Sequence, residues 1–322
     1  MARKTGSEKA AEIVDRFRAF EKEHHDLWSR MDEDLSLDRL EEWLPEDSQT
    51  EGYKTFTSND PQTVAKKIRS WVAGAEVLAR VPYAENKAKE RTAGDLKEKF
   101  FYGALRSADD RRLEMVENPL HADMTWYVVH RGQVAVRALL MKNEDGETCV
   151  DITPYDPRNT AFGTGAHGLE WICFRLEKRK ADLKSLYPKL RLNEEEDSHQ
   201  THTVYDYYDR VNNTIVMDGR ELKQPEPHGA GRVPCVFVRN HNMPDVFTSN
   251  GDTKPSRSLG ESVFESIRDT AKEKNEAMSV FLELSRRHRR QPVVITSPDG
   301  TATLDEDLWK EGSEVLVPEG TK

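Results

Sequence analysis

The sequence predicts an α+β protein, and three patterns lead to this fold class. Apolar residues recur at helical spacing in most of the first 117 residues. From Met124 to Val238 the apolar residues instead alternate with polar ones, as is typical of strands. A second helical pattern then runs from Ser258 to Arg290. We therefore expect an elongated subunit in which a region of helices and strands is followed by one long helix.

Three helices are predicted in the first part of the chain. Residues 8–44 carry apolar side chains at spacings of three and four on one face and many acidic side chains on the other, and Pro45 ends this run. A second helix begins at Asp60, which is followed by a proline at the first helical position. The third covers about residues 85–117, and its aromatic run Phe100–Tyr102 is the expected anchor to the core.

The alternating region predicts several short strands joined by turns and polar loops. Hairpins are expected around the turn at residues 143–146 and between the strands at 202–209 and 214–217. A short helix is expected at residues 178–187, and a polar loop at residues 224–231. The predicted strands are residues 126–129, 134–140, 149–152, 169–175, 202–209, 214–217 and 233–238.

The long helix has explicit start and stop signals. Ser258 is the predicted N-cap, Glu261 stands at the capping-box spacing, and Pro292 ends the helix. Its length of about 45 Å is large for a compact domain. One face carries an apolar stripe that we expect to lie in an interface between copies of the chain. The members of this predicted stripe are Val263, Ile267, Ala271, Met278 and Phe281.

The end of this helix carries the cluster Arg286, Arg287, Arg289 and Arg290. Two interpretations stay open. The arginines are the solvated end of a helix, where cations are favoured by the helix dipole, or they form part of a positive ring that faces nucleic acid or an acidic partner.

Composition limits the function classes. The chain has 322 residues, of which 33% are charged, and its net charge is -10. The protein is therefore not expected to bind nucleic acid over a broad surface, and any contact with DNA must be local. The three cysteines, without a CxxC pair, indicate a reducing compartment. We expect neither a signal peptide nor a membrane-spanning segment.

Few patterns point to catalysis. Residues 163–168 fit GxGxxG formally, but a strand-like segment follows them where a dinucleotide site needs a helix, so a flexible loop is favoured. His199 and His202 lie near an acidic run that reads as a solvated loop. We therefore expect no catalytic residue, metal or cofactor. A nucleotide-binding enzyme that uses residues 163–168 stays as an alternative, as does a helical scaffold or adaptor that uses the acidic N-terminal helices.

The order of several segments resembles the portal proteins, or head-to-tail connectors, of tailed bacteriophages. The three details most similar to that family are the turn Asp156–Asn159, the strand Val233–Asn240 and the Gly260–Ser262 start of the long helix. On this resemblance, residues 1–257 form the wing, residues 258–290 the first stem helix, and residues 291–322 the clip. Portal chains return through a second stem helix, a tunnel loop and a crown, so the clip of this chain is expected to be incomplete.

The resemblance also implies what the protein does. Portal subunits form a homo-oligomeric ring, usually of twelve copies, at one vertex of the capsid in the virion, after assembly in the host cytoplasm. Double-stranded DNA is packaged and ejected through the ring. The family itself performs no chemistry, and its partners are the terminase motor, the major capsid or scaffolding protein and a head–tail adaptor. Such a ring needs two different interface patches on each subunit. The stem stripe and the face of the N-terminal helices are the candidates.

Overall fold

The computed structural model confirms the α+β class. Seven α-helices and two antiparallel sheets, of three and five strands, occur in the described residues. The chain divides into two compact units, one from Met1–Leu35 and Val64–Glu265 and the other from residues 36–63 and 266–322. The described residues are 6–41, 55–82, 88–142, 146, 148–187, 199–240, 260–289, 294–297 and 315–318.

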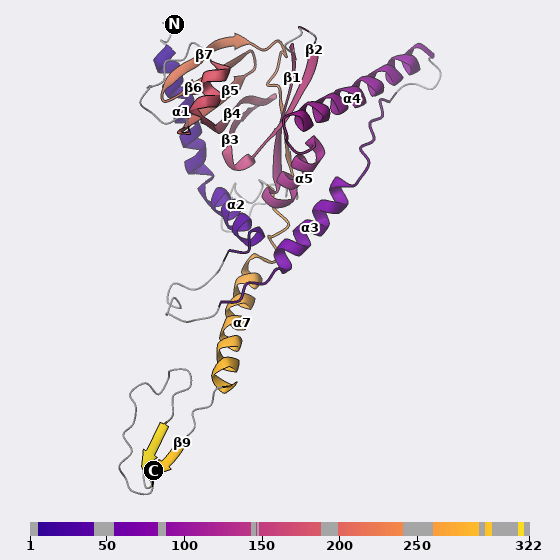
Figure 1. The fold of residues 1–322 in the computed structure, drawn as a ribbon. Coiled ribbons are helices and arrows are strands. Elements are labelled where there is room, and N and C mark those ends of the chain that lie inside the picture. Colours follow the sequence, from indigo (N-terminus) through magenta and orange to yellow (C-terminus); the bar gives the residue numbers. More distant parts are fainter. Residues whose placement is uncertain are drawn as a thin grey trace, which may run out of the picture. The chain divides into compact units, whose positions relative to one another are not determined.

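Both antiparallel sheets belong to the larger unit (Figure 1). In the three-stranded sheet, β1 (Gln133–Lys142) pairs with β2 (Thr148–Tyr155) on one side and β8 (Cys235–Arg239) on the other. The five-stranded sheet is a meander in which each strand pairs with the next along the chain. Its strands are β3 (Thr160–Gly165), β4 (Gly168–Arg179), β5 (Thr201–Asp209), β6 (Asn212–Met217) and β7 (Arg220–Pro227).

The predicted hairpins β1–β2 and β5–β6 are confirmed, but the polar loop predicted at residues 224–231 is wrong in its first half. There β7 pairs with β6 through a tight turn at Asp218 and Gly219, whose φ angles are 49° and 71°. Two positive φ angles are what a two-residue hairpin turn requires. The prolines of β7 are tolerated because this strand lies at the edge of the sheet.

The strand predicted at residues 126–129 is wrong, because these residues lie in helix α5 (Leu120–Arg131). The side chain of Asp109 accepts a hydrogen bond from the Leu120 amide at 2.6 Å, near the start of the helix. At its end, Gly132 adopts a left-handed conformation and its amide bonds to the Val128 carbonyl. Packing of this segment on the sheet region thus overrides its strand-like composition.

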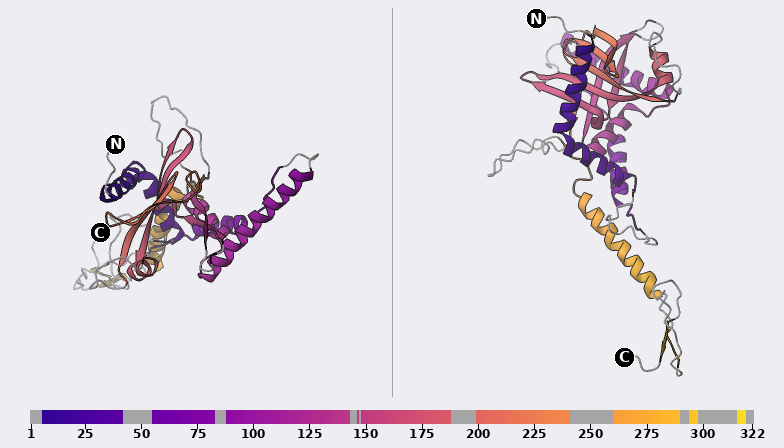
Figure 2. Two further views of the ribbon diagram at one scale, coloured as in Figure 1. Left: turned by 90° about the horizontal axis from the view of Figure 1, so that it is seen from above. Right: turned by 90° about the vertical axis from the view of Figure 1, so that its left-hand side faces the viewer.

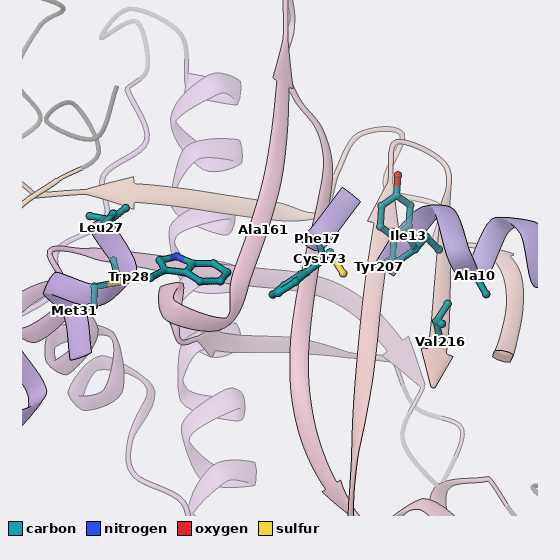
Figure 3. Packing of buried hydrophobic residues seen from close by; sticks show 10 residues of the cluster. All are labelled: Ala10, Ile13, Phe17, Leu27, Trp28, Met31, Ala161, Cys173, Tyr207 and Val216. Atoms are coloured by element: carbon teal, nitrogen blue, oxygen red, sulfur yellow. The ribbon is translucent and has the colours of Figure 1, made fainter. Parts of the chain in front are cut away.

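The predicted helical run of residues 8–44 forms two helices, α1 (Gly6–Glu23) and α2 (His25–Asp38). Helix α1 lies along the five-stranded sheet and contacts β7, β3 and β5 (Figures 1 and 2). Figure 3 shows the buried cluster that joins the two helices to this sheet. At its centre Phe17 is fully buried. The centroid of its ring is 5.3 Å from that of Tyr205 and 5.8 Å from that of Trp28.

The Asp156–Asn159 turn ties α2 and α5 together at the edge of the sheets. Pro157–Asn159 form a single 3-10 turn, and Asp156 caps it by accepting a hydrogen bond from the Arg158 amide at 2.9 Å. The same carboxylate bonds Arg131 of α5, 3.1 Å away. The Arg158 side chain bonds Asp32 of α2 at 3.0 Å and lies over the ring of Trp28.

Three more helices were expected and are present: α3 (Asp60–Ala73), α4 (Ala88–Glu114) and α6 (Lys180–Leu186). The anchoring role predicted for Phe100–Tyr102 is wrong, since Phe100 and Phe101 are 65% and 42% exposed. The C-terminal part of α4 makes the contacts instead. There Arg111 pairs with Asp151 of β2, and Arg112 pairs with Asp123 of α5.

The long helix, α7 (Arg268–Arg289), belongs to the smaller unit and is shorter than predicted. Residues 260–267 are not helical, so the capping-box prediction for Glu261 is wrong, and Ser258 lies outside the described residues. Gly260 has a φ of 90°, and the Val263 amide bonds the Val129 carbonyl. Phe264 is fully buried, which holds this segment on α5. In the same unit as α7, β9 (Val294–Ser297) and β10 (Val315–Pro318) pair in parallel.

We predict that Phe17→Ala lowers the free energy of unfolding of the larger unit by about 3–5 kcal/mol, because it opens a cavity in the buried cluster. Urea unfolding followed by tryptophan fluorescence measures the change. Arg18→Ala, at the neighbouring exposed position, serves as the control and should stay within about 0.5 kcal/mol of the parent chain. Equal losses for the two variants would contradict the placement of Phe17 in the core.

Candidate functional site

The buried side of α7 carries two polar side chains, Asn275 and Ser279. Ala271, Asn275 and Ser279, spaced four residues apart on one face, are 6%, 2% and 2% exposed. The Asn275 side chain accepts a hydrogen bond from the Ser58 amide at 2.9 Å, and the Ser279 hydroxyl accepts one from the Phe56 amide at 2.8 Å. The extended segment before α3 is thus held against α7 through its own backbone, because buried amides require acceptors.

An exposed ion pair lies beside these hydrogen bonds between α7 and the extended segment. The Lys274 ammonium pairs with the Asp60 carboxylate and lies 3.3 Å from the hydroxyl of Ser58. Hydrogen bonds from Lys274 and Ser58 and the charge of Lys274 lower the pKa of Asp60. Both side chains are well exposed, so solvent screens the pair, and it adds little to stability.

The opposite side of α7 carries an exposed apolar row. We use the name α7 row for Ala277, Val280, Phe281 and Leu284, which follow the spacing i, i+3, i+4, i+7 of one helix face. The exposed fractions of Val280, Phe281 and Leu284 are 41%, 60% and 51%. A helix that buries a polar side and exposes an apolar one is the reverse of the usual surface helix, so the α7 row has the character of a contact surface.

The five residues predicted for the subunit interface do not form one stripe. Val263 and Ile267 precede α7 in a turn, and Ala271 is already buried within the single chain. Met278 is half-buried, and only Phe281 belongs to the exposed α7 row. The periodicity of the sequence does not select Ala277, Val280 and Leu284. If the helix began at Ser258, Val263 and Ile267 would share a face with Ala271 and Met278, and the three residues of the row lie on another face.

The arginine cluster lies at the end of α7, as predicted. Arg286 is half-buried, and its guanidinium is 4.0 Å from the carboxylate of Glu283, one turn earlier. Arg287 and Arg289 belong to the last turn of the helix, although their side chains are outside the described residues, as is the whole of Arg290. Positive charge at a helix C-terminus is favoured by the helix dipole. The interpretation of the arginines as a solvated helix end therefore requires no bound nucleic acid or protein.

The larger unit contains a cavity of about 840 Å³ lined by residues of both sheets and α6. Its polar wall is built around the Arg137 guanidinium, which pairs with the carboxylates of Asp151 and Asp206 and bonds the Tyr208 hydroxyl at 2.9 Å. Asn213 donates a 2.7 Å hydrogen bond to Asp206. Burial raises the pKa of Asp206, while the charge of Arg137 and these hydrogen bonds act in the opposite direction.

The groups near this cavity are poorly suited to nucleophilic chemistry. Burial raises the pKa of the Cys235 thiol to about 12 and that of Cys173 well above its usual value. Both thiols are therefore protonated at neutral pH, whereas the nucleophilic form of cysteine is the thiolate. Both cysteines are buried.

The glycine motif of residues 163–168 lies in the hairpin between β3 and β4, so no helix begins there to bind a phosphate. A Cβ atom on Gly163 would stand 2.2 Å from the indole nitrogen of Trp171, which explains a glycine at this position by packing. His202 is 3.6 Å from the carboxylate of Asp218. Within the described ranges, no group of three or more His, Cys, Asp or Glu side chains is placed to hold a metal ion.

Comparison with known proteins gives no relative: no protein-family model matches the chain, and no curated protein matches it. Among the described helices, none is both long and apolar enough to cross a membrane.

We predict that Asn275→Ala costs about 1–3 kcal/mol, because it leaves the buried Ser58 amide without an acceptor. Faster hydrogen exchange of the peptide that spans residues 55–59 reports the effect directly. Glu276→Ala changes the next, exposed residue of α7 and should leave that exchange rate as it is. Unchanged exchange in Asn275→Ala would show that the segment is held by other contacts.

Proposed function

We propose that this protein is a portal-type subunit, one copy of a closed ring through which double-stranded DNA enters and leaves a capsid. The α7 row carries the proposal. Its apolar side chains are exposed on a helix whose other side is already occupied by the chain's own backbone. A second copy of the chain that covers this row would remove apolar surface from water at about 25 cal/mol per Å².

The chemistry of the row fits contact between identical chains. On one flank of the row Met278 and Ser285 carry no charge, whereas Glu276 and Glu283 lie along the other flank. The surface of the next copy that covers the row must therefore carry no acidic side chains at that second flank. In a closed ring each subunit meets its two neighbours through different patches. The α7 row is one such patch in this proposal, and a different surface of the next copy covers it.

The charge of the chain is compatible with DNA that moves. With a net charge of -10, the protein does not hold a polyanion over a broad surface. Each phosphate contact strengthens binding and makes it more dependent on salt. The four arginines near residue 290 then provide a local cationic ring on otherwise acidic subunits, which guides a duplex or docks the packaging motor. The order of the turn, strands and long helix, similar to that of portal chains, supports the same function.

The ring is tested by two charges placed in the row. Phe281→Glu combined with Leu284→Glu should convert ring-sized particles into monomers, because ionised carboxylates are costly to bury in an interface. Mass photometry and negative-stain electron microscopy of the full chain measure the change. Parent protein that stays monomeric at high concentration would contradict the proposal.

Lys67→Glu is the matched control for this experiment, since it places a carboxylate at an exposed position outside α7. Its particles should keep the size of the parent's. Circular dichroism of each variant separates lost assembly from lost folding.

The arginine cluster is tested separately. Replacing Arg286, Arg287, Arg289 and Arg290 together by alanine should leave ring assembly intact, because the α7 row is unchanged, and should reduce DNA packaging or terminase docking. Packaged DNA per particle, measured by quantitative amplification, is the readout, and ring formation by microscopy is the control. Normal packaging would favour the interpretation of the cluster as a solvated helix end.

A further inference from the structure

Helix α4 carries a second exposed row, which follows a heptad pattern. Ala93, Leu96, Phe100, Gly103 and Ser107 alternate at spacings of three and four, the a and d positions of a coiled-coil seam. We call these five residues the α4 row. All five are exposed, and Leu96 and Phe100 are 61% and 65% exposed. In Figures 1 and 2 the N-terminal end of α4 extends away from the sheets of its unit.

The opposite face of α4 is used by the chain itself. The Glu98 carboxylate accepts a 2.7 Å hydrogen bond from the Val81 amide, and the Tyr102 hydroxyl accepts one of 2.7 Å from the Ala79 amide. Ala108 and Arg112 on the same side are buried. The helix is therefore fixed in rotation, and its own contacts hold the α4 row outward.

Gly103 is a second, independent indication of a partner at this row. A glycine within a helix is less favourable than alanine, and one reason for it is the close approach of another backbone. Here a Cβ atom added to Gly103 would meet nothing within 4 Å, and Gly103 is not among the glycines with positive φ. The described part of the chain thus gives no reason for glycine, whereas the close approach of another helix backbone would.

The flanks of the row are basic. Lys99 and Arg106 occupy the g positions and Lys97 an e position, and all three are exposed. Residues at these positions choose the partner of a coiled coil by charge. We propose that the α4 row is a docking surface for an amphipathic helix of another protein, whose apolar stripe is flanked by glutamate or aspartate side chains.

The same charges argue against the same row of a second copy. Two α4 rows placed together would bring lysine and arginine of one chain against those of the other, which costs free energy in either orientation. The acidic helices α1 and α2 of a second copy do not fit either, because their apolar residues are buried in the core of the larger unit. A separate acidic helix meets both conditions, whereas the α7 row of a second copy, with Glu276 and Glu283 beside it, is the alternative that the oligomer outcome of the test below detects. This inference is independent of the ring.

The test uses a synthetic helical peptide about three heptads long, with leucine at a and d and glutamate at e and g, and a reference peptide with lysine at e and g. Fluorescence anisotropy with the full chain should show the glutamate peptide binding about tenfold or more tightly than the lysine peptide. The preference should shrink as salt rises from about 0.05 to about 0.5 M.

Variants locate the binding. Lys97→Glu, Lys99→Glu and Arg106→Glu together should reverse the preference between the peptides. The matched control reverses three exposed charges outside α4, at Lys67, Lys184 and Arg220, and should keep the preference of the parent chain. Leu96→Ser with Phe100→Ser should abolish binding of the glutamate peptide, with circular dichroism as a check of folding.

Three results would overturn the proposal: no binding of either peptide, equal binding of both, or a control variant that loses the preference as fully as the α4 variant. A dimer or ring of the parent chain that disappears in the Leu96→Ser, Phe100→Ser variant would assign the row to a second copy instead. Failure of the ring experiment at α7 leaves these readouts unaffected, because they concern a different helix and a different binding partner.

Discussion

The pairing of a buried guanidinium with two carboxylates is the interaction on which the larger unit depends. Arg137 stands on β1 and pairs with Asp151 of the neighbouring strand and with Asp206 of β5 in the other sheet. The rings of Tyr155 and Tyr208 lie 5.4 and 5.8 Å from it. A charge taken out of water is tolerated only when its partners are held in place, so this set fixes the two sheets against each other in one register. Phe174 and Tyr208 then pack between the sheets around it.

The smaller unit is shaped by the same need for partners, because buried backbone amides require hydrogen-bond acceptors as a buried charge requires counter-charges. The amides of Phe56 and Ser58 must find acceptors, and α7 supplies Ser279 and Asn275 for them. This requirement places polar side chains on the buried side of the helix. The apolar side chains Val280, Phe281 and Leu284 of α7 are left on the exposed side. The exposed α7 row is therefore a consequence of how one extended segment satisfies its hydrogen bonds.

The sequence could predict most strands, because β-branched and aromatic residues are frequent in segments such as β4 and β5. Burial does not alternate in the middle of these two strands, where Ile172–Phe174 and Asp206–Tyr208 are buried on both faces. It could not predict α5, since Trp126–Val129 has a strand-like composition and only packing and the Gly132 cap make it helical. The start of α7 was misplaced for a similar reason. The capping-box pattern at Ser258 is local, whereas the burial of Phe264 depends on α5.

The candidate site was harder to predict than the fold. Hydrophobic periodicity selects the apolar side of a helix as the buried one, and α7 reverses this because its acceptors serve amides from a distant part of the sequence. Asn275 and Ser279 therefore carried no signal before the structure was known. The exposed positions Val280 and Leu284 did carry one, since their spacing with Ala277 and Phe281 is that of a single face.

The two exposed rows differ in the charges beside them, and this difference decides what each can accept. The α7 row is flanked by the uncharged Met278 and Ser285 on one side and by Glu276 and Glu283 on the other, so its charged flank is acidic. The α4 row is flanked by Lys97, Lys99 and Arg106, which repel an identical row. A chain with two apolar rows and no such distinction would bind copies of itself through both and form open aggregates. Acidic residues beside the α7 row and basic residues beside the α4 row favour partners of different charge, and under the two proposals α7 serves self-association whereas α4 accepts an acidic helix.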